Sequence, residues 1–397
     1  MRVKYVYNWG FFHPPGSGAD LVAANHVAYL TARGWDVDCL IVRDPRRDHA
    51  EAAFRAEYGR LSSLTLTDPP GGGWSLGDQL FAFDALANRP AVRDFLAAPA
   101  DAFLTNYVFT APLVSKLPAG CRRVLESVDV MCDQFALADR RPDGRPFPAG
   151  LARARTAYNL RAELDLYRLF DAVLMINRDE YDRVRRFGAA NAVYVPRWCE
   201  PPADAGGEPA GTTHDLLFVA SANPINRAGI EWFYRHVFVR HLWRRGVRLA
   251  IAGGVCGLLD IADTNVTLLG VVDGSLAPVY RSAAVVVAPI FEGTGLSIKT
   301  VEALAMGKAM IGAPAAARGL DPRSGAFLTL DMKADPAATA DTILDLLADP
   351  VKRRTLEQKA AAYARREFGR ETFFAAMDRA YQLAGFEPAA ELRARSA

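Results

Sequence analysis

A lysine and a glutamate behind a glycine-rich segment are the residues of this sequence best suited to chemistry. Lys299 and Glu302 are three positions apart, so on a helix they share one face. Just before them, Gly293 and Gly295 allow the backbone to approach a ligand closely. A lysine can neutralise a phosphate, and a glutamate can accept two hydrogen bonds from ribose hydroxyls. The spacing therefore predicts a nucleoside diphosphate site, against the plainer interpretation of two solvated surface charges.

The surrounding segments predict the elements that position this pair. Residues 285–289 are a short apolar, mostly β-branched run, which is typical of a strand buried on both faces of a parallel sheet. Ser297 is a candidate helix N-cap, apolar residues recur behind it at helical spacing, and Gly307 ends the helix. This order aims a helix N-terminus, with its free N–H groups and partial positive charge, at a ligand over the carboxyl edge of the sheet.

The same segment resembles the donor-binding motif of retaining glycosyltransferases of the GT-B fold, the glycosyl transferases group 1 family. The common motif is Glu-Gly-x-Gly with a second glutamate eight positions after the first, whereas Glu292 and Glu302 are ten positions apart. A variant branch reads Gly-x-Gly-x-x-x-Lys-x-x-Glu-Ala-x-Ala-x-Gly, and the sequence matches it from Gly293 to Gly307. The resemblance implies that Glu302 holds the ribose and that Lys299 faces the diphosphate. Glu292 either contacts the transferred sugar or only shapes the loop.

The expected donor site includes residues behind three earlier strands, at 216–220, 249–252 and 266–269. Strands that end in glycine or small polar residues before a helix suit a nucleotide site at a sheet's carboxyl edge. An Asn-x-x-Gly pattern of the same family branch follows the first strand, and the arginine inside it is either a phosphate ligand or an exposed side chain. The predicted donor-binding residues are Asn226, Arg227, Gly253, Gly270, Gly293, Thr294, Gly295, Leu296, Ser297 and Glu302, with Lys299 and Glu292 as catalytic candidates.

The N-terminal part of the chain begins as a strand, a glycine- and proline-rich loop, a helix and a second strand, which predicts a parallel βαβ unit. Gly16 and Gly18 do not complete a dinucleotide-binding fingerprint, because Leu21 stands where the third glycine would be. In the resembling family this loop faces the cleft between the domains, near sugar and acceptor. His13, Gly16 and Gly18 are therefore acceptor-side candidates, although a lone histidine is more often structural.

Polar residues follow two further strands of this part of the chain. Asn106 lies just after the carboxyl end of the predicted strand 102–104, and it is a fourth acceptor-side candidate. Asp129 follows the predicted strand 124–128, where the resembling family often has an acidic or His-Asp pair. Asp129 is thus a catalytic candidate that orients the acceptor, or else it caps the next helix.

The length of 397 residues predicts two domains. The stretch 201–213 is rich in proline, glycine and alanine without apolar periodicity, and we expect a linker there. The resemblance implies an acceptor-side domain over 1–200, a nucleotide-sugar-binding domain over 214–370, and a helix in 371–397 that returns to the first domain before a frayed tail. The expected fold class is α/β, with two Rossmann-like, doubly wound parallel-sheet domains facing a cleft.

Composition excludes several classes of protein. Hydrophobic residues at 51% and charged residues at 23% describe a globular chain, and a net charge of +2 gives no argument for nucleic-acid binding. The five cysteines form no Cys-x-x-Cys pair, which favours reduced thiols in a cytoplasmic protein. We find no signal peptide and no apolar run of about 18 residues, so we expect no transmembrane segment. Peripheral contact with the inner membrane face stays open.

The resemblance implies a sugar transferase that needs no cofactor. The six histidines show no His-x-x-x-His spacing, so metallohydrolase chemistry is not indicated. The expected reaction moves a sugar, with retention and without metal, from a UDP or GDP donor to a saccharide or other hydroxyl acceptor, as in polysaccharide or lipopolysaccharide assembly. Two alternatives stay open: a nucleotide-sugar epimerase on the same fold, and a non-catalytic nucleotide-sugar-binding protein.

Overall fold

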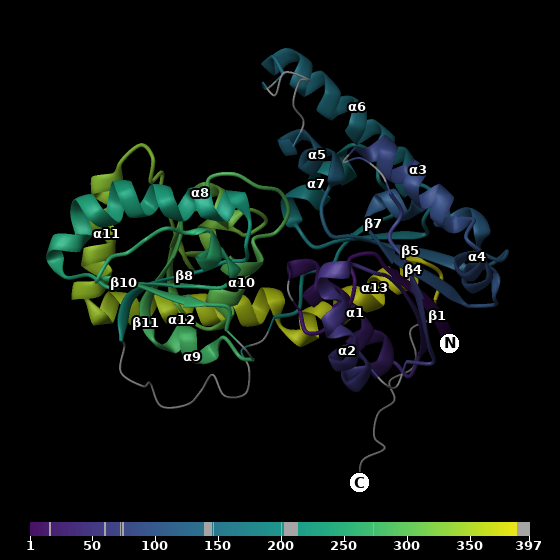
Figure 1. Cartoon of the computed structure of the whole chain (residues 1–397), viewed down its shortest axis with the longest axis horizontal. Coiled ribbons are helices and arrows are strands. Elements are labelled where there is room, and N and C mark those ends of the chain that lie inside the picture. The colour runs from purple at the N-terminus through teal and green to yellow at the C-terminus, as the bar shows by residue number, and fades with distance from the viewer. Residues whose placement is uncertain are drawn as a thin grey trace, which may run out of the picture. The chain divides into compact units, whose positions relative to one another are not determined.

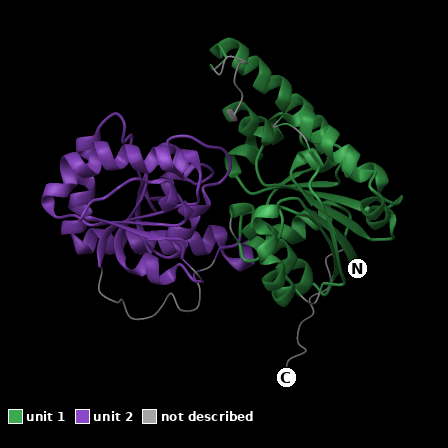
Figure 2. Cartoon of the chain, in the orientation of Figure 1, with its two compact units in different colours: residues 1–197, 373–397 green, residues 198–372 purple. Residues whose placement is uncertain are grey.

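The structure is a computed structural model that describes residues 1–15, 17–58, 61–71, 73, 75–138, 145, 147–199, 201, 213–272 and 274–386. The chain divides into two compact units (Figure 2). Unit 1 comprises Met1–Arg197 and Phe373–Ala397, and unit 2 comprises Trp198–Thr372. The expected linker at 201–213 falls almost entirely outside the described ranges, and so does the expected frayed tail beyond 386.

Unit 1 contains a seven-stranded sheet with the strand order β3-β2-β1-β4-β5-β6-β7, and its strand pairs are parallel. Apolar runs predicted most of these strands, but not β3, because its side chains are half exposed at the sheet edge and form no continuous apolar run. The strands are β1 (Arg2–Tyr7), β2 (Asp36–Val42), β3 (Ser63–Thr67), β4 (Ala102–Asn106), β5 (Arg122–Ser127), β6 (Ala172–Met175) and β7 (Ala192–Tyr194).

Helices cover both faces of this sheet (Figure 1). Tyr5 and His26 face each other between the sheet and α1, and α13 packs on the same side through Tyr381. On the opposite face, Lys4 donates a hydrogen bond to the carbonyl of Leu96 in α4 (2.7 Å). The helices of this unit are α1 (Gly18–Ala32), α2 (Glu51–Glu57), α3 (Leu76–Ala87), α4 (Pro90–Ala97), α5 (Met131–Ala138), α6 (Ala149–Tyr167), α7 (Arg178–Arg186) and α13 (Arg370–Leu383), with 3-10 segments η1 (Pro45–Ala50) and η2 (Val108–Lys116).

Unit 2 contains a six-stranded sheet with the order β10-β9-β8-β11-β12-β13, again with parallel pairs. Every residue of β11 is buried, as its apolar run predicted, whereas the two-residue strand β13 was not predicted because it is too short to show a pattern. The strands are β8 (His214–Val219), β9 (Leu249–Ala252), β10 (Val266–Gly270), β11 (Ala283–Ala288), β12 (Ala309–Gly312) and β13 (Leu328–Thr329).

The helices of unit 2 lie on opposite faces of its sheet, with α8 and α11 on one face and α9, α10 and α12 on the other (Figure 1). This follows from right-handed crossovers that run in opposite directions on either side of the β8–β11 pair. The helices are α8 (Pro224–Phe233), α9 (Ala277–Arg281), α10 (Ile298–Ala305), α11 (Pro336–Ala348) and α12 (Pro350–Phe368), with a π-helical segment η4 (Tyr234–Leu242) and 3-10 segments η6 (Gly254–Leu258) and η7 (Pro314–Ala317).

Both sheets are doubly wound, which confirms the predicted α/β fold class. The strand order reverses between β1 and β4 in unit 1 and between β8 and β11 in unit 2. In open parallel sheets, ligands bind outside the carboxyl ends of the strands at such reversals. The two edges at these reversals are therefore the places to look for a site. In the described part of the chain, none of the helices has the length and apolar composition to cross a membrane.

Candidate functional site

The glycine loop, residues 292–296, follows β11 at the reversal point of the second sheet. Gly293 has φ +138° and Gly295 has φ +66°, backbone conformations that residues with side chains rarely adopt. Gly229, in α8, has a different reason to be glycine: a Cβ there would lie 2.0 Å from the carbonyl oxygen of Pro289. Glycine thus lets α8 approach the chain just behind β11. The helix α8 and the chain after β11 therefore meet at the edge where we predicted the nucleotide site.

The N-terminus of α10 is left without a side-chain cap. Ser297 occupies the N-cap position, but its side chain makes no capping hydrogen bond. Its hydroxyl instead lies 2.8 Å from that of Thr300, and the Thr300 hydroxyl donates to the carbonyl of Ala316 (2.7 Å). Ser297 thus has the predicted N-cap position, but the capping hydrogen bond expected from its side chain does not form. The consequence is a helix end whose partial positive charge is available to an anion.

Lys299 lies just inside this helix end, and its ammonium group is directed by a neighbouring element. Its Nζ donates to Oδ1 of Asn226 at the start of α8 (3.1 Å), while Nδ2 of Asn226 donates to the carbonyl of Ser221 (3.0 Å). The pKa of Lys299 is lowered to about 8, first by burial and then by the charge of Arg318, while the charge of Glu302 opposes both. The structure therefore brings together Lys299, Asn226 and the glycine loop.

Arg318 is a member of this group that the sequence interpretation missed. Its Nη2 donates to the carbonyl of Thr294 (2.9 Å) and its Nε to the carbonyl of Gly295 (3.2 Å). A further hydrogen bond reaches the carbonyl of Ala315. The signal available in the sequence was a lone cation behind β12, the strand next to β11. That signal is weak, because the bonds join residues more than twenty positions apart.

The remaining predicted donor residues lie at the same edge but differ in their contacts. Glu302 is half-buried in α10, and Glu292 is exposed at the start of the glycine loop. Arg227 is exposed and pairs with Glu231 on its own helix (2.7 Å), so the structure holds it as a surface charge in this arrangement. Gly253 follows β9 and Gly270 is the last residue of β10, and the Gly253 N–H donates to the Gly270 carbonyl (2.6 Å). Their roles in binding stay predictions.

Two buried asparagines lie at the reversal point of the first sheet. Asn106 ends β4 and Asn8 follows β1, and neither side-chain amide has a hydrogen-bond partner within the described ranges. The next residues, Trp9 and Tyr107, contact each other edge to face with ring centroids 5.9 Å apart. Asn8 and Trp9 were not predicted from the sequence, although their position directly behind a buried strand is the available signal. This edge is polar and aromatic.

Asp129 lies close to this edge. Burial raises the pKa of Tyr107, and the charge of Asp129 is the next contribution. Tyr107 also has φ +63°, the one positive φ of a non-glycine residue in the described part of the chain. The Asp129 carboxylate accepts a hydrogen bond from Gln134. The cap of the following helix, α5, includes Glu163, whose carboxylate accepts from two of the backbone N–H groups there. The acceptor-orienting role of Asp129 stays a prediction.

The first loop supplies fewer contacts with chemistry. His13 is half-buried and its ring packs edge-on against Tyr58, with centroids 5.9 Å apart. Gly18 is the first residue of α1, behind the N-cap Ser17. Gly16 lies outside the residues that the structure describes. The described members of this group thus pack or begin a helix, and their acceptor-side roles stay predictions.

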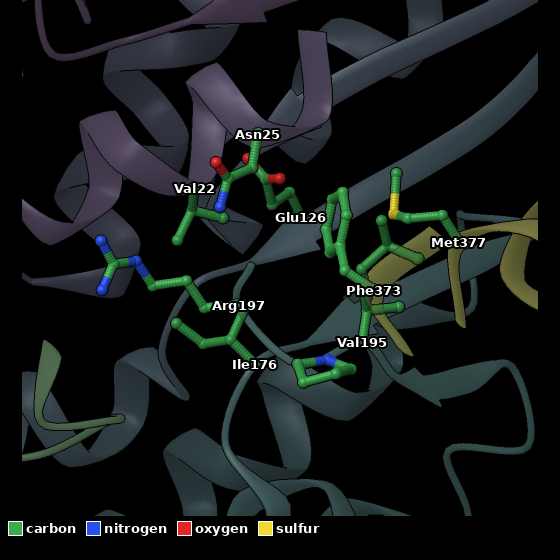
Figure 3. A pocket seen from close by; sticks show the side chains of 10 residues that line it. Val22, Asn25, Glu126, Ile176, Val195, Arg197, Phe373 and Met377 are labelled. Carbon is green, nitrogen blue, oxygen red and sulfur yellow. The ribbon is translucent and has the colours of Figure 1, made fainter. Parts of the chain in front are cut away.

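A small pocket in unit 1 contains none of the predicted site residues (Figure 3). Figure 3 shows Asn25 and Glu126 on one side of it and Phe373 and Met377 of α13 on another. Glu126 is buried and accepts a hydrogen bond from the hydroxyl of Tyr5 (3.2 Å), while its other oxygen lies 2.8 Å from Nδ1 of His26. We interpret this pocket as space left beside the buried network that holds α13.

Comparisons with known proteins give a partial family match and similar solved structures. Residues 213–349 match the sequence model of a family described as Glycosyl transferases group 1, a range that contains the glycine loop, α10 and Arg318. No curated protein matches the sequence at a significant level. Among solved structures, the chain is similar to sucrose-phosphate synthase from Thermosynechococcus elongatus, with 17% identity, a TM-score of 0.64, and coverage of 96% of this chain and 98% of that one.

Two further solved structures have a similar fold over nearly their whole length. HepE from Anabaena, solved in complex with UDP, is 15% identical with a TM-score of 0.62, covering 97% of this chain and 100% of that one. The N-terminal domain of trehalose-6-phosphate phosphatase from Candida albicans is 10% identical with a TM-score of 0.66, covering 96% and 97%. The fold is GT-B. At these identities the structural similarities establish the fold alone, and the activity has to be argued from the site.

Proposed function

We propose that the protein is a retaining, metal-independent glycosyltransferase that moves a sugar from a nucleoside diphosphate to a hydroxyl acceptor. The observation that carries the proposal is the ammonium group of the half-buried Lys299 at the uncapped N-terminus of α10, bonded to Asn226 across the β8–β11 reversal. The match of residues 213–349 to the group 1 family supports it. So does HepE, which shares the fold and was solved with UDP.

In the proposed reaction, the bond between the sugar's anomeric carbon and the diphosphate oxygen breaks as the acceptor oxygen bonds that carbon from the same face. The acceptor proton passes to the departing diphosphate, so the products are the glycoside and a nucleoside diphosphate. Negative charge grows on the diphosphate, and the Lys299 ammonium and the α10 N-terminus stabilise it without a metal. Glu302 binds the ribose hydroxyls, and Gly253 and Gly270 line the nucleotide.

The acceptor is proposed to bind unit 1 at the carboxyl edge of its sheet, near Asn106 and Asp129. A saccharide fits this edge, because carboxamide and carboxylate groups match hydroxyls and the aromatic rings beside them can pack on a sugar face. We place the reaction in polysaccharide or lipopolysaccharide assembly in the cytoplasm. The reduced thiols expected from the cysteine pattern support that compartment.

The first test is thermal stabilisation by UDP, GDP, ADP and dTDP, each with and without EDTA. A ligand at 100-fold over its dissociation constant stabilises the folded state by about 2.7 kcal/mol, which is readily measured. We expect one nucleotide to stand out, unaffected by EDTA and without effect on Glu302→Ala. A chain that responds to none of the four contradicts the proposal.

A second measurement separates transfer from its alternatives. Transferase activity releases nucleoside diphosphate from a nucleotide sugar only when an acceptor is present, apart from slow hydrolysis. An epimerase changes the donor sugar without any acceptor. A non-catalytic binding protein binds the donor and releases nothing. Incubating the stabilising nucleotide's sugar conjugates with and without a saccharide mixture, and following donor and product by mass spectrometry, distinguishes the three.

A further inference from the structure

We propose that Arg318 is a positioning residue of the donor site, which holds the glycine loop in the shape that presents backbone N–H groups to the diphosphate. The inference rests on the proposed function and adds to it the residue that shapes the loop. Arg318 is half-buried and comes from the turn behind β12, a different element from the loop that it contacts.

The geometry of the peptide group explains the effect. Arg318 donates to the carbonyl oxygens of two successive residues, Thr294 (2.9 Å) and Gly295 (3.2 Å). A trans peptide unit is planar, so its N–H points away from its carbonyl oxygen. Holding these two carbonyls therefore turns the N–H groups of Gly295 and Leu296 to the side of the loop opposite Arg318. Successive N–H groups directed to one side form a concave anion site.

Two contacts tie the same turn to both parts of the site. The Arg318 guanidinium also donates to the carbonyl of Ala315, which holds the side chain against its own turn. From the other direction, the Thr300 hydroxyl of α10 donates to the carbonyl of Ala316 (2.7 Å). The glycine loop, the first turn of α10 and the turn behind β12 are thus linked by hydrogen bonds, and a change at Arg318 reaches Lys299 through the loop.

Electrostatics points to the same ligand chemistry. After burial, the charge of Arg318 is the next cause that lowers the pKa of Lys299. The positive charges of Arg318 and Lys299 repel each other when no anion is bound, and a bound diphosphate relieves this repulsion. Binding should therefore be accompanied by proton uptake on Lys299 at mildly alkaline pH.

Gly293 offers an independent way to disturb the same contact. A Cβ at Gly293 would lie 2.9 Å from Nη2 of Arg318, and the backbone there has φ +138°. The Gly293→Ala substitution should therefore displace the guanidinium from the loop carbonyls. We expect it to reproduce the effect of losing Arg318 although the arginine itself is still present.

The experiment compares Arg318→Met, Arg318→Lys and Gly293→Ala with wild type. The matched control is Arg323→Met, because Arg323 is 91% exposed and pairs with Asp321 just beyond the same turn. The first readout is the titration of Lys299, followed by NMR after 13C-methylation of the lysines and assigned with Lys299→Arg. We expect a higher pKa of Lys299 in Arg318→Met, a value near that of wild type in Arg318→Lys, and no change in the control.

The second readout is the affinity for inorganic pyrophosphate and for UDP, GDP, ADP and dTDP, measured by calorimetry. Arg318→Met and Arg318→Lys should both weaken the affinity by about 10 to 100-fold, because a lysine cannot hold two carbonyls at once. Gly293→Ala should fall in the same range. Proton uptake on binding, read from two buffers of different ionisation enthalpy, should disappear in Arg318→Met.

The two proposals fail in different ways. An unchanged Lys299 titration in Arg318→Met, or affinities equal to those of Arg323→Met, overturns the positioning role whatever the wild-type activity. A wild type that binds none of the five probes overturns the proposed function, and the donor role of Arg318 with it. Should Arg318→Met fail to fold, Arg318→Lys and Gly293→Ala still decide the matter, because both keep a cation at the site.

Discussion

Lys299 differs from an ordinary surface lysine in ways that matter for its proposed task. It is held by Asn226 at 3.1 Å, and its pKa is lowered to about 8. At neutral pH the ammonium form dominates, so the group can stabilise the charge on a leaving diphosphate. At mildly alkaline pH it loses the proton, and that contribution goes with it. An arginine in its place would keep the charge at every accessible pH.

Activity should therefore depend on pH through this residue. We expect kcat/KM of the wild type to fall as pH rises above about 8, and Lys299→Arg to lack that fall while having a lower plateau. Lys299→Met should lose on the order of 10²-fold or more of kcat. Lys359→Met, at an exposed lysine, is the control. A pH–rate profile with the same alkaline limb in Lys299→Arg and wild type would exclude Lys299 as its source.

The lowered pKa of Lys299 also makes the free energy of unfolding depend on pH. In the native state the pKa of Lys299 lies below its ordinary 10.5, so between about 8 and 10.5 the unfolded chain binds the extra proton. The free energy of unfolding therefore gains from this group as pH rises through that range. The cost of burying the ammonium is fully present only below about pH 8. Activity and stability thus depend on this group in opposite directions, as expected of a functional residue.

At the scale of elements, two helix N-termini show how differently the chain treats backbone N–H groups. The end of α10 has no side-chain cap, whereas α5 receives the carboxylate of Glu163, which accepts from the N–H groups of Met131 (2.9 Å) and Cys132 (2.8 Å). Glu163 is fully buried on α6, and its other partner is the hydroxyl of Tyr167 (2.8 Å). A capped end is closed to ligands. An uncapped one is open to them.

Glu163→Gln tests this capping. Burial raises the pKa of Glu163 from 4.5 to about 7, so between these values the native state binds the extra proton and the wild type loses stability as pH rises. The glutamine cannot titrate, and its NH₂ group faces one backbone N–H. We expect it to cost about 1–3 kcal/mol of unfolding free energy. The deficit should be largest near pH 4.5 and shrink towards pH 7, measured by urea unfolding at both ends of that range.

The control for that prediction is Asp165→Asn on the same helix, an exposed carboxylate that should show neither the deficit nor the pH trend. A Glu163→Gln deficit that does not change with pH would mean that the raised pKa is wrong. A deficit equal to that of Asp165→Asn would mean that the cap contributes nothing.

Sequence patterns predicted the elements better than the contacts between them. The apolar runs gave β11 and β9, and helical spacing gave α10 and α12 to within a few residues. The edge strands β3 and β13 were missed, because a half-exposed or two-residue strand has no apolar run. Arg318 was missed because its partners lie in another loop, and hydrogen bonds to backbone carbonyls leave no residue pattern.

The candidate site shows the same division. Gly293 and Gly295 have positive φ values, and Lys299 follows them in the first turn of α10. Their roles in donor binding stay predictions. Arg227 was left open between a phosphate ligand and a surface charge, and in the structure its guanidinium pairs with Glu231. Side-chain pairing of that kind is decided by rotamers on one helix turn, which spacing alone does not fix.

At the scale of the whole molecule, unit 1 is built from both ends of the chain. Residues 1–197 form its sheet, and α13 from the far end packs on it. The contact is polar as well as apolar: the hydroxyl of Tyr381 lies 2.8 Å from Nε2 of His26, and Asp378 accepts from the hydroxyl of Tyr29 (2.8 Å). Unit 1 can therefore fold completely only with α13, which follows unit 2 in the sequence. We expect α13 to unfold together with unit 1.

Tyr381→Phe tests this assignment with a single atom removed. His26 is buried, so loss of the hydroxyl leaves its Nε2 without that partner, and we expect unit 1 to lose about 1–3 kcal/mol. Hydrogen exchange should become faster in β1, β4, β5 and α13, while β8 and β11 of unit 2 exchange as in wild type. Tyr158→Phe, at a tyrosine that is 75% exposed, is the control. If hydrogen exchange became equally faster in both units, the two units would unfold as one cooperative unit. That result would contradict the assignment of α13 to unit 1 alone.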